Sequence, residues 1–209
     1  MSKNVTKNQH YVPQVYLRGF SKDYEPGIKA PEKGGVYGYD LINRFQSLDV
    51  PIESVCRETY LYEIKNDERI RDIAINYCLP FFSVIDLDKP ESMLMKMMLG
   101  RLKDMYFSVG VDKSGRLITS DKAVYIYGQP EPNIEFEKVI FPITSKLCIV
   151  LSGGDEKKRY KRKNFLFPMD DRLRRNVFDS ISLNASRWIF ANHKMGAEEL
   201  SWIDMIIEQ

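Results

Sequence analysis

The chain has 209 residues, of which 44% are hydrophobic and 12% aromatic, and its net charge is +2 at pH 7. This composition is typical of a globular protein, and the sequence has neither a long apolar run nor a signal-like start, which excludes a membrane-spanning protein. We therefore expect a single cytoplasmic domain over residues 1–209, with no membrane partner. Cys56, Cys78 and Cys148 are far apart and lack any C-x-x-C spacing, which argues against a disulfide framework and a structural zinc site.

Elements of the N-terminal part are indicated by proline, glycine and alternating apolar residues. Residues 1–9 are polar, and we expect them to be loose. Val12–Phe20 predicts a helix of about two turns, because Pro13 suits the first helical position and Gly19 can end the run. The runs "GVYGYD" and "RFQSLDV" flank "LINR" within residues 35–50 and predict a β-hairpin.

Residues 68–110 have helical periodicity and predict a helical insert. Pro80 interrupts this insert, and Pro90 opens its second segment. The second segment has a wide apolar face that consists of Met93, Leu94, Met97, Met98, Leu102 and Met105. A methionine-rich face suits an adaptable groove for a protein partner, although core packing is the commoner use of such a face.

The next part of the chain predicts strands. Four runs alternate or are continuously apolar at strand length, and we expect them to form the main antiparallel sheet: residues 116–121, 123–128, 138–144 and 146–153.

The C-terminal part returns to helical spacing. Residues 170–193 predict one long helix with Asp170 or Asp171 as its N-cap, and residues 196–207 predict a short amphipathic helix. Because strands and helices are grouped apart, the fold class is α+β: a mainly antiparallel sheet with a short N-terminal helix, a central helical segment and C-terminal helices.

The strongest electrostatic feature is a basic region over residues 157–175. Between residues 151 and 175 there are nine Lys or Arg residues against four Asp or Glu residues. The segment "KKRYKRK" places Tyr160 among six basic residues: Lys157, Lys158, Arg159, Lys161, Arg162 and Lys163. Such a segment can follow a phosphate backbone while its tyrosine stacks on a base, which makes nucleic acid a candidate partner. The alternative is a solvated loop between a strand and a helix.

His10 is one of two histidines in the chain and directly precedes the predicted N-terminal helix. The partial positive charge of a helix N-terminus should lower the pKa of the imidazole and keep it neutral near pH 7, as a base or ligand requires. Gln14 and Arg18 lie four residues apart, so both should face the same side, with Arg18 able to bind an anion. The alternative is a His10 packed into the core and an Arg18 held in a salt bridge.

The stretch "IEFEKV" is similar to the end of a restriction-type nuclease site, in which carboxylates hold a divalent metal and a lysine supports the attacking water. Glu135, Glu137 and Lys138 would supply these groups, and Asp121 is the preceding acidic residue that would complete them. The alternative is a solvated strand face with alternating charges. The cofactor is therefore unknown, with a divalent metal as the candidate, and no residue is assigned as a metal ligand.

Several stretches together resemble a bacterial family catalogued as domain of unknown function 4238. They are "HYVPQVYLRGFS", "VYGYDLINR", "ESVCRETYLYE", "ITSDKAV" followed by "FPITSKLCIVLS", and "SLNASRWIFAN". The resemblance implies that seven residues occupy motif positions of the family: His10, Pro13, Gln14, Arg18, Asp121, Asn184 and Arg187. It brings no activity with it. The chain departs from the family by having Ala123 where a proline is usual and by a shorter middle part.

The resemblance groups six polar residues into one hypothetical cleft. We expect His10 and Asp121 to act in acid–base chemistry and Gln14, Arg18, Asn184 and Arg187 to bind substrate. Two arginines suit an anionic substrate, so the leading hypothesis is a nuclease-like hydrolase of a phosphate-bearing substrate such as nucleic acid. The alternative hypothesis is a non-catalytic interaction protein in bacterium–phage conflict, which binds a protein or a nucleic acid.

Overall fold

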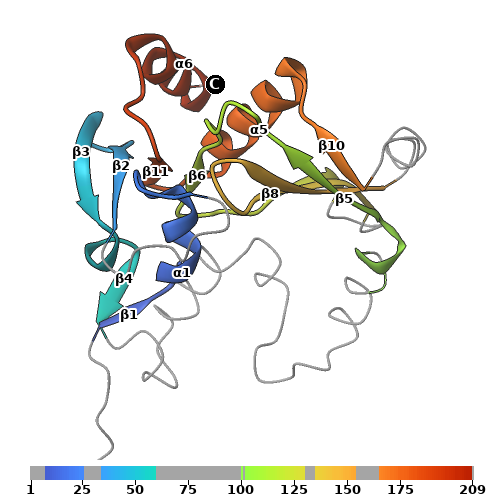
Figure 1. The fold of residues 1–209 in the computed structure, drawn as a ribbon, viewed down its shortest axis with the longest axis horizontal. Coiled ribbons are helices and arrows are strands. Elements are labelled where there is room, and N and C mark those ends of the chain that lie inside the picture. Colours follow the sequence, from blue (N-terminus) through green and yellow to red (C-terminus); the bar gives the residue numbers. More distant parts are fainter. Residues whose placement is uncertain are drawn as a thin grey trace, which may run out of the picture.

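The computed structural model describes residues 8–25, 34–59, 100, 102–129, 135–153 and 165–208. In this part of the chain, helices and strands are grouped into two larger sheets, one small strand pair and helices that pack over the sheets (Figure 1). All strand pairs among the described residues are antiparallel except one. The predicted α+β class is therefore confirmed.

The N-terminal segment forms a strand and a short helix. Strand β1 (Asn8–His10) pairs with β4 (Arg57–Thr59). Helix α1 (Gln14–Leu17) continues into the 3-10 turn η1 (Arg18–Phe20), which confirms the helix predicted for this stretch. Pro13 is the N-cap of α1 rather than its first helical residue, and its extended backbone directs the chain out of β1 into the helix.

A four-stranded sheet has the order β3-β2-β11-β6. The predicted hairpin is confirmed as β2 (Gly35–Asp40) and β3 (Phe45–Pro51), and β3 leads into the 3-10 turn η2 (Ile52–Ser54). β11 (Trp188–Ala191) lies between β2 and β6 (Thr119–Ser120) and pairs antiparallel with both. This sheet therefore brings together three parts of the chain that are distant in sequence.

The long helix predicted for residues 170–193 is correct only in its first part. Helix α5 runs over Asp171–Asn184, and the Asp170 side chain caps it by accepting a hydrogen bond from the Leu173 backbone at 2.8 Å. At Ala185 the backbone becomes extended, and the next apolar residues form β11 instead of further turns. The prediction fails beyond Asn184 because pairing with β2 and β6 uses the same apolar residues that also fit a helical period.

A five-stranded sheet has the order β10-β5-β9-β8-β7. Its strands are β10 (Leu166–Pro168), β5 (Tyr106–Val111), β9 (Leu147–Ser152), β8 (Glu135–Pro142) and β7 (Tyr125–Gln129). β10 is parallel to β5, whereas the other pairs are antiparallel. Three of the four predicted runs are thus neighbours in one sheet.

Two predictions in this region need correction. The run at residues 116–121 contributes only β6, and β6 belongs to the four-stranded sheet. Residues 106–110 were expected to end the helical insert, but they form β5 after a helical stretch at residues 102–104. Pairing along the whole length of β9 decides the strand conformation, and the helical period of the preceding residues carries no information about that pairing.

Two hydrophobic clusters hold these sheets and helices together. The larger one joins α5 through Leu173, Val177 and Ile181 to the five-stranded sheet, and it also includes Ile203 of α6 (Ala197–Ile207), the predicted C-terminal helix. The smaller one packs α1 and η1 against the four-stranded sheet, with Phe190 of β11 among its buried residues. The larger cluster also contains Ile189 and Ala191 of β11, whose side chains face away from that of Phe190, so the four-stranded sheet is covered on both faces.

Several predictions fall outside the described residues. They are residues 1–7 of the predicted loose start, most of the helical insert with Met93, Leu94, Met97 and Met98, and the basic segment with Lys157, Lys158, Arg159, Lys161, Arg162 and Lys163. Residues 8 and 9, which were also expected to be loose, form β1 because they pair with β4. Cys56 and Cys148, which are described, are buried free thiols. None of the helices in the described ranges has the length and apolar character that a membrane span needs.

Candidate functional site

Asp121 directly follows β6 and is 1% exposed. Its Oδ1 accepts the backbone N–H of Ser186 at 2.9 Å, and its Oδ2 accepts the backbone N–H of Arg187 at 2.9 Å. The Asp121 backbone N–H donates to the Trp188 carbonyl at 3.0 Å. Burial raises the pKa of Asp121, although the backbone donors oppose this effect. The carboxylate therefore stabilises the turn between α5 and β11.

Asn184 is the last residue of α5, and its side chain binds the segment that follows Asp121. The Asn184 amide donates to the Lys122 carbonyl at 2.7 Å and to the Val124 carbonyl at 2.9 Å. Backbone carbonyls outside regular pairing need such donors when they are partly buried. Asn184 thus joins the end of α5 to the connection between β6 and β7.

Arg187 completes this arrangement through Asp40 at the end of β2. The Arg187 guanidinium donates to Asp40 Oδ2 from Nη2 at 3.0 Å and from Nε at 3.3 Å. Burial raises the pKa of Asp40, but hydrogen bonds from Arg187 and Asn43 outweigh it, so the pKa lies below its usual value. We call Asp40, Asp121, Asn184 and Arg187 the polar junction, because they connect α5, β11, β6 and β2.

The N-terminal motif positions lie on a different part of the fold. The His10 backbone pairs with Arg57 in the β1–β4 pair, and the placement of the His10 side chain is outside the described structure. Gln14 and Arg18 are half-buried on α1 and η1, and each has an interaction of its own. Their assignment to one cleft with Asp121 stays a prediction.

Cys56 provides a link between the N-terminal segment and the polar junction. Its carbonyl accepts the Tyr11 backbone N–H at 2.9 Å. Burial raises the pKa of the Cys56 thiol, and the nearby negative charge of Asp121 raises it further. The Cys56 carbonyl therefore holds the residue that follows His10, and the Cys56 thiol lies close enough to Asp121 to sense its charge.

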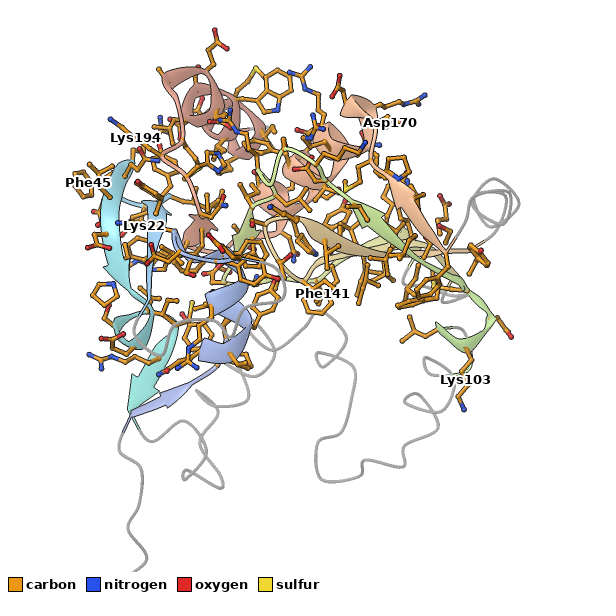
Figure 2. The ribbon with its side chains drawn as sticks, viewed as in Figure 1. Lys22, Phe45, Lys103, Phe141, Asp170 and Lys194 are labelled. Carbon is orange, nitrogen blue, oxygen red and sulfur yellow. The ribbon has the colours of Figure 1, made fainter. Side chains whose placement is uncertain are left out.

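Tyr16 has a role that the sequence did not reveal beyond core filling. Its hydroxyl lies 2.5 Å from Thr119 Oγ1 in β6 and donates to the Pro142 carbonyl in β8 at 2.6 Å. Its ring stacks on Phe141, whose side chain is seen beside α1 in Figure 2. One tyrosine thus connects α1 to both larger sheets. The only sequence signal for this role of Tyr16 is its position in the "YLRGF" stretch, and that position does not predict a hydrogen bond of its hydroxyl.

Two of the predicted metal-binding carboxylates, Glu137 and Asp121, lie in different sheets, and the side chain of Glu135 is outside the described structure. Glu137 is exposed on β8 of the five-stranded sheet, whereas Asp121 is buried at the end of β6 in the other sheet. In the described ranges, no group of three or more His, Cys, Asp or Glu side chains is placed to hold a metal ion. A divalent metal therefore stays a prediction without a described ligand set.

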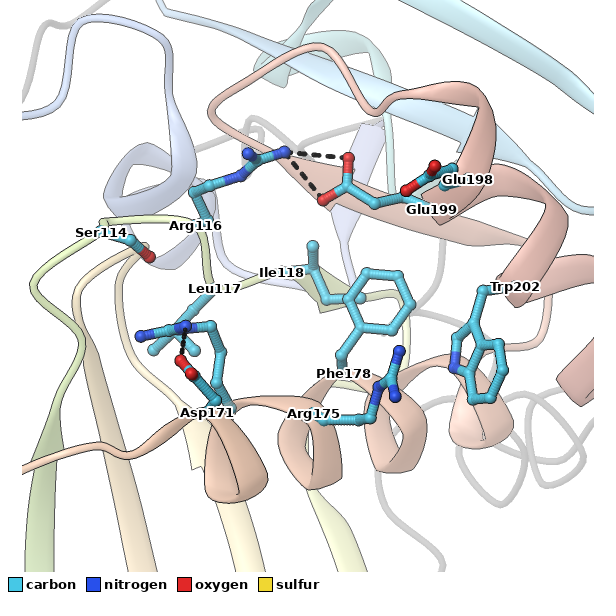
Figure 3. A pocket seen from close by; sticks show the side chains of 11 residues that line it. Ser114, Arg116, Leu117, Ile118, Asp171, Arg175, Phe178, Glu198, Glu199 and Trp202 are labelled. Carbon is cyan, nitrogen blue, oxygen red and sulfur yellow. Dashed lines mark hydrogen bonds and ion pairs between the residues drawn. The ribbon is translucent and has the colours of Figure 1, made fainter.

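A pocket of about 700 Å³ lies between the loop at residues 114–118, α5 and α6 (Figure 3). Its apolar lining comes from Leu117, Ile118, Phe178 and Trp202. Its charged lining residues are Arg116, Asp171, Arg174, Arg175, Glu198 and Glu199. A pocket of this size with an apolar lining and a few polar groups has the usual dimensions of a small-molecule site.

Two of the three arginines in the pocket are paired with carboxylates. Arg174 binds the buried Asp112 at 2.9 Å and the exposed Asp171 at 2.7 Å. Arg116 Nη2 donates to both carboxylate oxygens of Glu199, at 2.9 and 3.0 Å. These pairs hold the loop, α5 and α6 in position and neutralise most of the charge of the lining.

Glu199 is the most strongly perturbed acid of the pocket. The hydrogen bond to His193, the Gly196 backbone N–H at 2.8 Å and the charge of Arg116 outweigh burial and lower the pKa of Glu199 to about 2. The carboxylate therefore stays ionised and caps the start of α6, as expected of a glutamate at the third helical position.

Arg175 and Glu198 differ from the other charged residues of the pocket. The Arg175 guanidinium lies over the Trp202 ring at 4.7 Å, and Trp202 Nε1 donates to Asp179 at 2.8 Å. Within the described part of the chain, no carboxylate is within ion-pair distance of Arg175, and no cationic side chain is within that distance of Glu198. Arg175 and Glu198 thus present uncommitted charges to a ligand.

Sequence reasoning found only part of this pocket. Arg174 and Arg175 belong to the basic region predicted to bind nucleic acid, but Glu198 and Trp202 came from an amphipathic helix without an assigned function. The pocket forms because α5 packs beside α6, and no local pattern encodes that contact. None of the predicted catalytic or substrate-binding motif positions is among the lining residues.

Comparison with known proteins gives one match. A family model described as "Protein of unknown function (DUF4238)" matches residues 8–80 and 84–195. No curated protein and no solved structure matches the chain. The match includes the polar junction and the α5 wall of the pocket, and it ends just before α6.

Proposed function

The chain belongs to the family of unknown function DUF4238, whose description names no activity, and we propose from the pocket itself that the protein binds a small phosphate-bearing ligand, such as a nucleotide or the end of a nucleic acid chain. The observation that carries this proposal is Arg175. Its guanidinium stacks on Trp202 and lacks a carboxylate partner among the described residues, so its N–H groups are available to an anion.

The way in which Trp202 holds the Arg175 guanidinium in place favours this role for Arg175. The hydrogen bond from the indole to Asp179 restricts the ring, and the ring in turn restricts the guanidinium. A guanidinium that is already ordered loses less conformational entropy when it binds a ligand. In Figure 3, the Arg175 guanidinium lies beside Trp202, so a phosphate bound to its N–H groups would have aromatic surface close by for an attached ring.

The remaining charges limit the size of the anion. Arg116 and Arg174 are already paired, and Glu198 adds a negative charge to the lining. A pocket with one free arginine suits one terminal phosphate better than a run of backbone phosphates, because each further phosphate would meet carboxylates. We therefore favour a nucleotide or a chain end over continuous nucleic acid. A nucleotide ligand agrees with the predicted cytoplasmic location.

The proposal is binding rather than hydrolysis by the predicted acid–base pair. Asp121 does not line the pocket, and both of its oxygens accept backbone N–H groups. A general base must reach the proton that it abstracts, directly or through one water. Hydrolysis by His10 and Asp121 stays a separate prediction, and product analysis in the binding experiment tests it.

Isothermal titration with AMP and with inorganic phosphate tests the proposal. We expect wild-type protein to bind AMP and Arg175→Ala to bind it at least tenfold more weakly. Arg172→Ala is the matched control, because Arg172 is an exposed arginine on the same helix but does not line the pocket. Equal weakening in both variants, or no binding by the wild type, would overturn the proposal. Nucleoside or free phosphate in the sample after the titration would indicate hydrolysis.

A protein partner is the second candidate, and the exposed apolar residues of α6 favour it. Met205 and Ile207 are 41% and 43% exposed. Met205 also lines a second hollow of about 410 Å³ on α6, together with Trp202. Methionine adapts to different partner surfaces. A Met205→Glu variant that loses a co-purifying protein but still binds AMP would favour this candidate.

A further inference from the structure

Glu198 and Trp202 line both hollows on α6, the larger one of about 700 Å³ and the smaller one of about 410 Å³. We infer that Glu198 makes the site selective for nucleotides whose base carries an exocyclic amino group, with the base stacked on Trp202 and the phosphate at Arg175. The inference rests on the proposed function and specifies which ligands the same site prefers.

Glu198 is placed to contact a base that lies on Trp202. The two residues are four positions apart in α6, so their side chains lie on the same face of the helix. Glu198 and Trp202 both line each of the two hollows, which agrees with this placement. A ring that stacks on the indole would therefore have its edge near the Glu198 carboxylate.

Glu198 is also available as an acceptor, in contrast to its neighbour. Glu199 is occupied by Arg116, His193 and the Gly196 backbone. Glu198 is exposed, and among the described residues it has no ion pair or hydrogen bond of its side chain. A ligand can thus use Glu198 without breaking an existing contact.

The chemistry of a carboxylate explains the selectivity. An ionised glutamate only accepts hydrogen bonds, so it pairs with an amino group such as that of cytosine or adenine. Uracil and hypoxanthine present a carbonyl oxygen at the corresponding position, and this oxygen meets the carboxylate with like partial charge. Every base can stack on an aromatic ring, so the contact at the edge of the base decides which nucleotide binds more tightly.

Arg175 fits the other end of such a ligand. Its guanidinium covers one face of the Trp202 ring at 4.7 Å, so the base would stack on the opposite face, and the phosphate contact and the stacking surface lie on the two sides of one ring. Arg175 and Glu198 are the two uncommitted charges of the described lining, and they have opposite signs. A nucleotide with an amino group on its base has the matching pair: an anionic phosphate and a hydrogen-bond donor, separated by a flat ring.

The test is titration with two pairs of nucleotides, CMP with UMP and AMP with IMP. We expect wild-type protein to bind CMP and AMP at least fivefold more tightly than UMP and IMP. In Glu198→Gln the preference should fall to about one or reverse, because an amide can donate to a carbonyl oxygen. Glu53→Gln is the control, since Glu53 is an exposed acid outside both hollows whose change removes the same charge.

The outcomes separate the inference from the proposed function. Equal affinities within each pair, or an unchanged preference in Glu198→Gln, would overturn the inference while Arg175-dependent binding still supported the proposed function. Absence of nucleotide binding, or binding that is insensitive to Arg175→Ala, would overturn both. Inorganic phosphate should bind Glu198→Gln at least as tightly as wild type, because the variant removes a negative charge from the lining, and this binding shows that the variant remains folded at the Arg175 end of the pocket.

Discussion

The carboxylate of Asp121 accepts the backbone N–H of Arg187 at 2.9 Å, while the Arg187 guanidinium binds Asp40 at 3.0 Å. Two positions of the family motifs are therefore in contact. The contact joins a side chain to a backbone group, and it stabilises the turn that leads from α5 into β11. These residues stabilise the connection between α5, β11 and β2, and the ligand binding that we propose takes place in another part of the fold.

Asp121→Ala should lower the free energy of unfolding by about 3 kcal/mol, because the backbone N–H groups of Ser186 and Arg187 both lose their acceptor. Asp121→Asn keeps one acceptor oxygen and should cost less, about 1–2 kcal/mol. Urea denaturation measures both variants. Lys113→Ala, an exposed change, is the control. An Asp121→Ala protein as stable as the control would show that the carboxylate does not stabilise this turn.

Tyr16→Phe should lower the free energy of unfolding by about 1–2 kcal/mol, because the Pro142 carbonyl and the Thr119 hydroxyl lose their partner while the ring packing is kept. Tyr127→Phe removes an equivalent hydroxyl from a tyrosine that is 55% exposed and should change little. Thermal unfolding of both variants compares them directly. The same loss in both would contradict the bridging role of Tyr16.

Gly19→Ala should destabilise the protein by about 1–3 kcal/mol through overpacking. An added Cβ would lie 2.8 Å from the Ile143 carbonyl oxygen, which is backbone and cannot rotate away. The Gly19 carbonyl also accepts the Ser145 N–H at 3.0 Å, so η1 is held against this turn. Gly100→Ala serves as the control, because no atom of the described residues lies within 4 Å of the added Cβ. A shift in the denaturation midpoint that is no larger for Gly19→Ala than for Gly100→Ala would refute the tight contact.

Glu199→Gln should be less stable than wild type at pH 7, and the difference should shrink in acid. The pKa of Glu199 is lowered to about 2 in the folded protein from an ordinary 4.5, so its ionised form favours folding. This contribution is fully present above about pH 4.5 and disappears as the pH falls toward 2. Its size is on the order of 2 kcal/mol once solvent screening is included.

Urea denaturation of wild type and Glu199→Gln at pH 7.0, 4.5 and 3.0 measures this difference. Asp40 and Asp112 also have lowered pKa values, so both proteins lose stability in acid, and only the gap between them reports on Glu199. A gap that is constant from pH 7.0 to 3.0 would contradict the assignment.

Local signals in the sequence predicted elements whose ends are marked by particular residues. Asp170 indicated the start of α5, Pro13 indicated the start of the N-terminal helix, and the composition of "GVYGYD" and "RFQSLDV" indicated the hairpin. Gly19 does not end that helix, since η1 continues to Phe20. In each case a few adjacent residues satisfy their own backbone groups. Such signals act within one turn or one hairpin, and here they sufficed.

The failures occurred where distant segments compete for the same residues. Trp188 and Ile189 fit a helical period, yet they pair with β2 and β6, and the chain after Asn184 is a strand. Tyr106–Val111 followed a helical pattern, yet it pairs with β9. Hydrogen bonding along a neighbouring strand overrides a weak local preference, and the neighbour lies tens of residues away in the sequence.

The sequence alone determined the α+β class and the family, because these depend on patterns and residue types that the chain carries locally. Only the tertiary structure decided that Asp121 meets Arg187 and what these residues do. It buried Asp121 beneath two backbone N–H groups, and it packed α5 beside α6 so that Arg175 lies on Trp202 with Glu198 nearby in the lining. A pocket depends on which surfaces meet, and that depends on the packing of the whole chain.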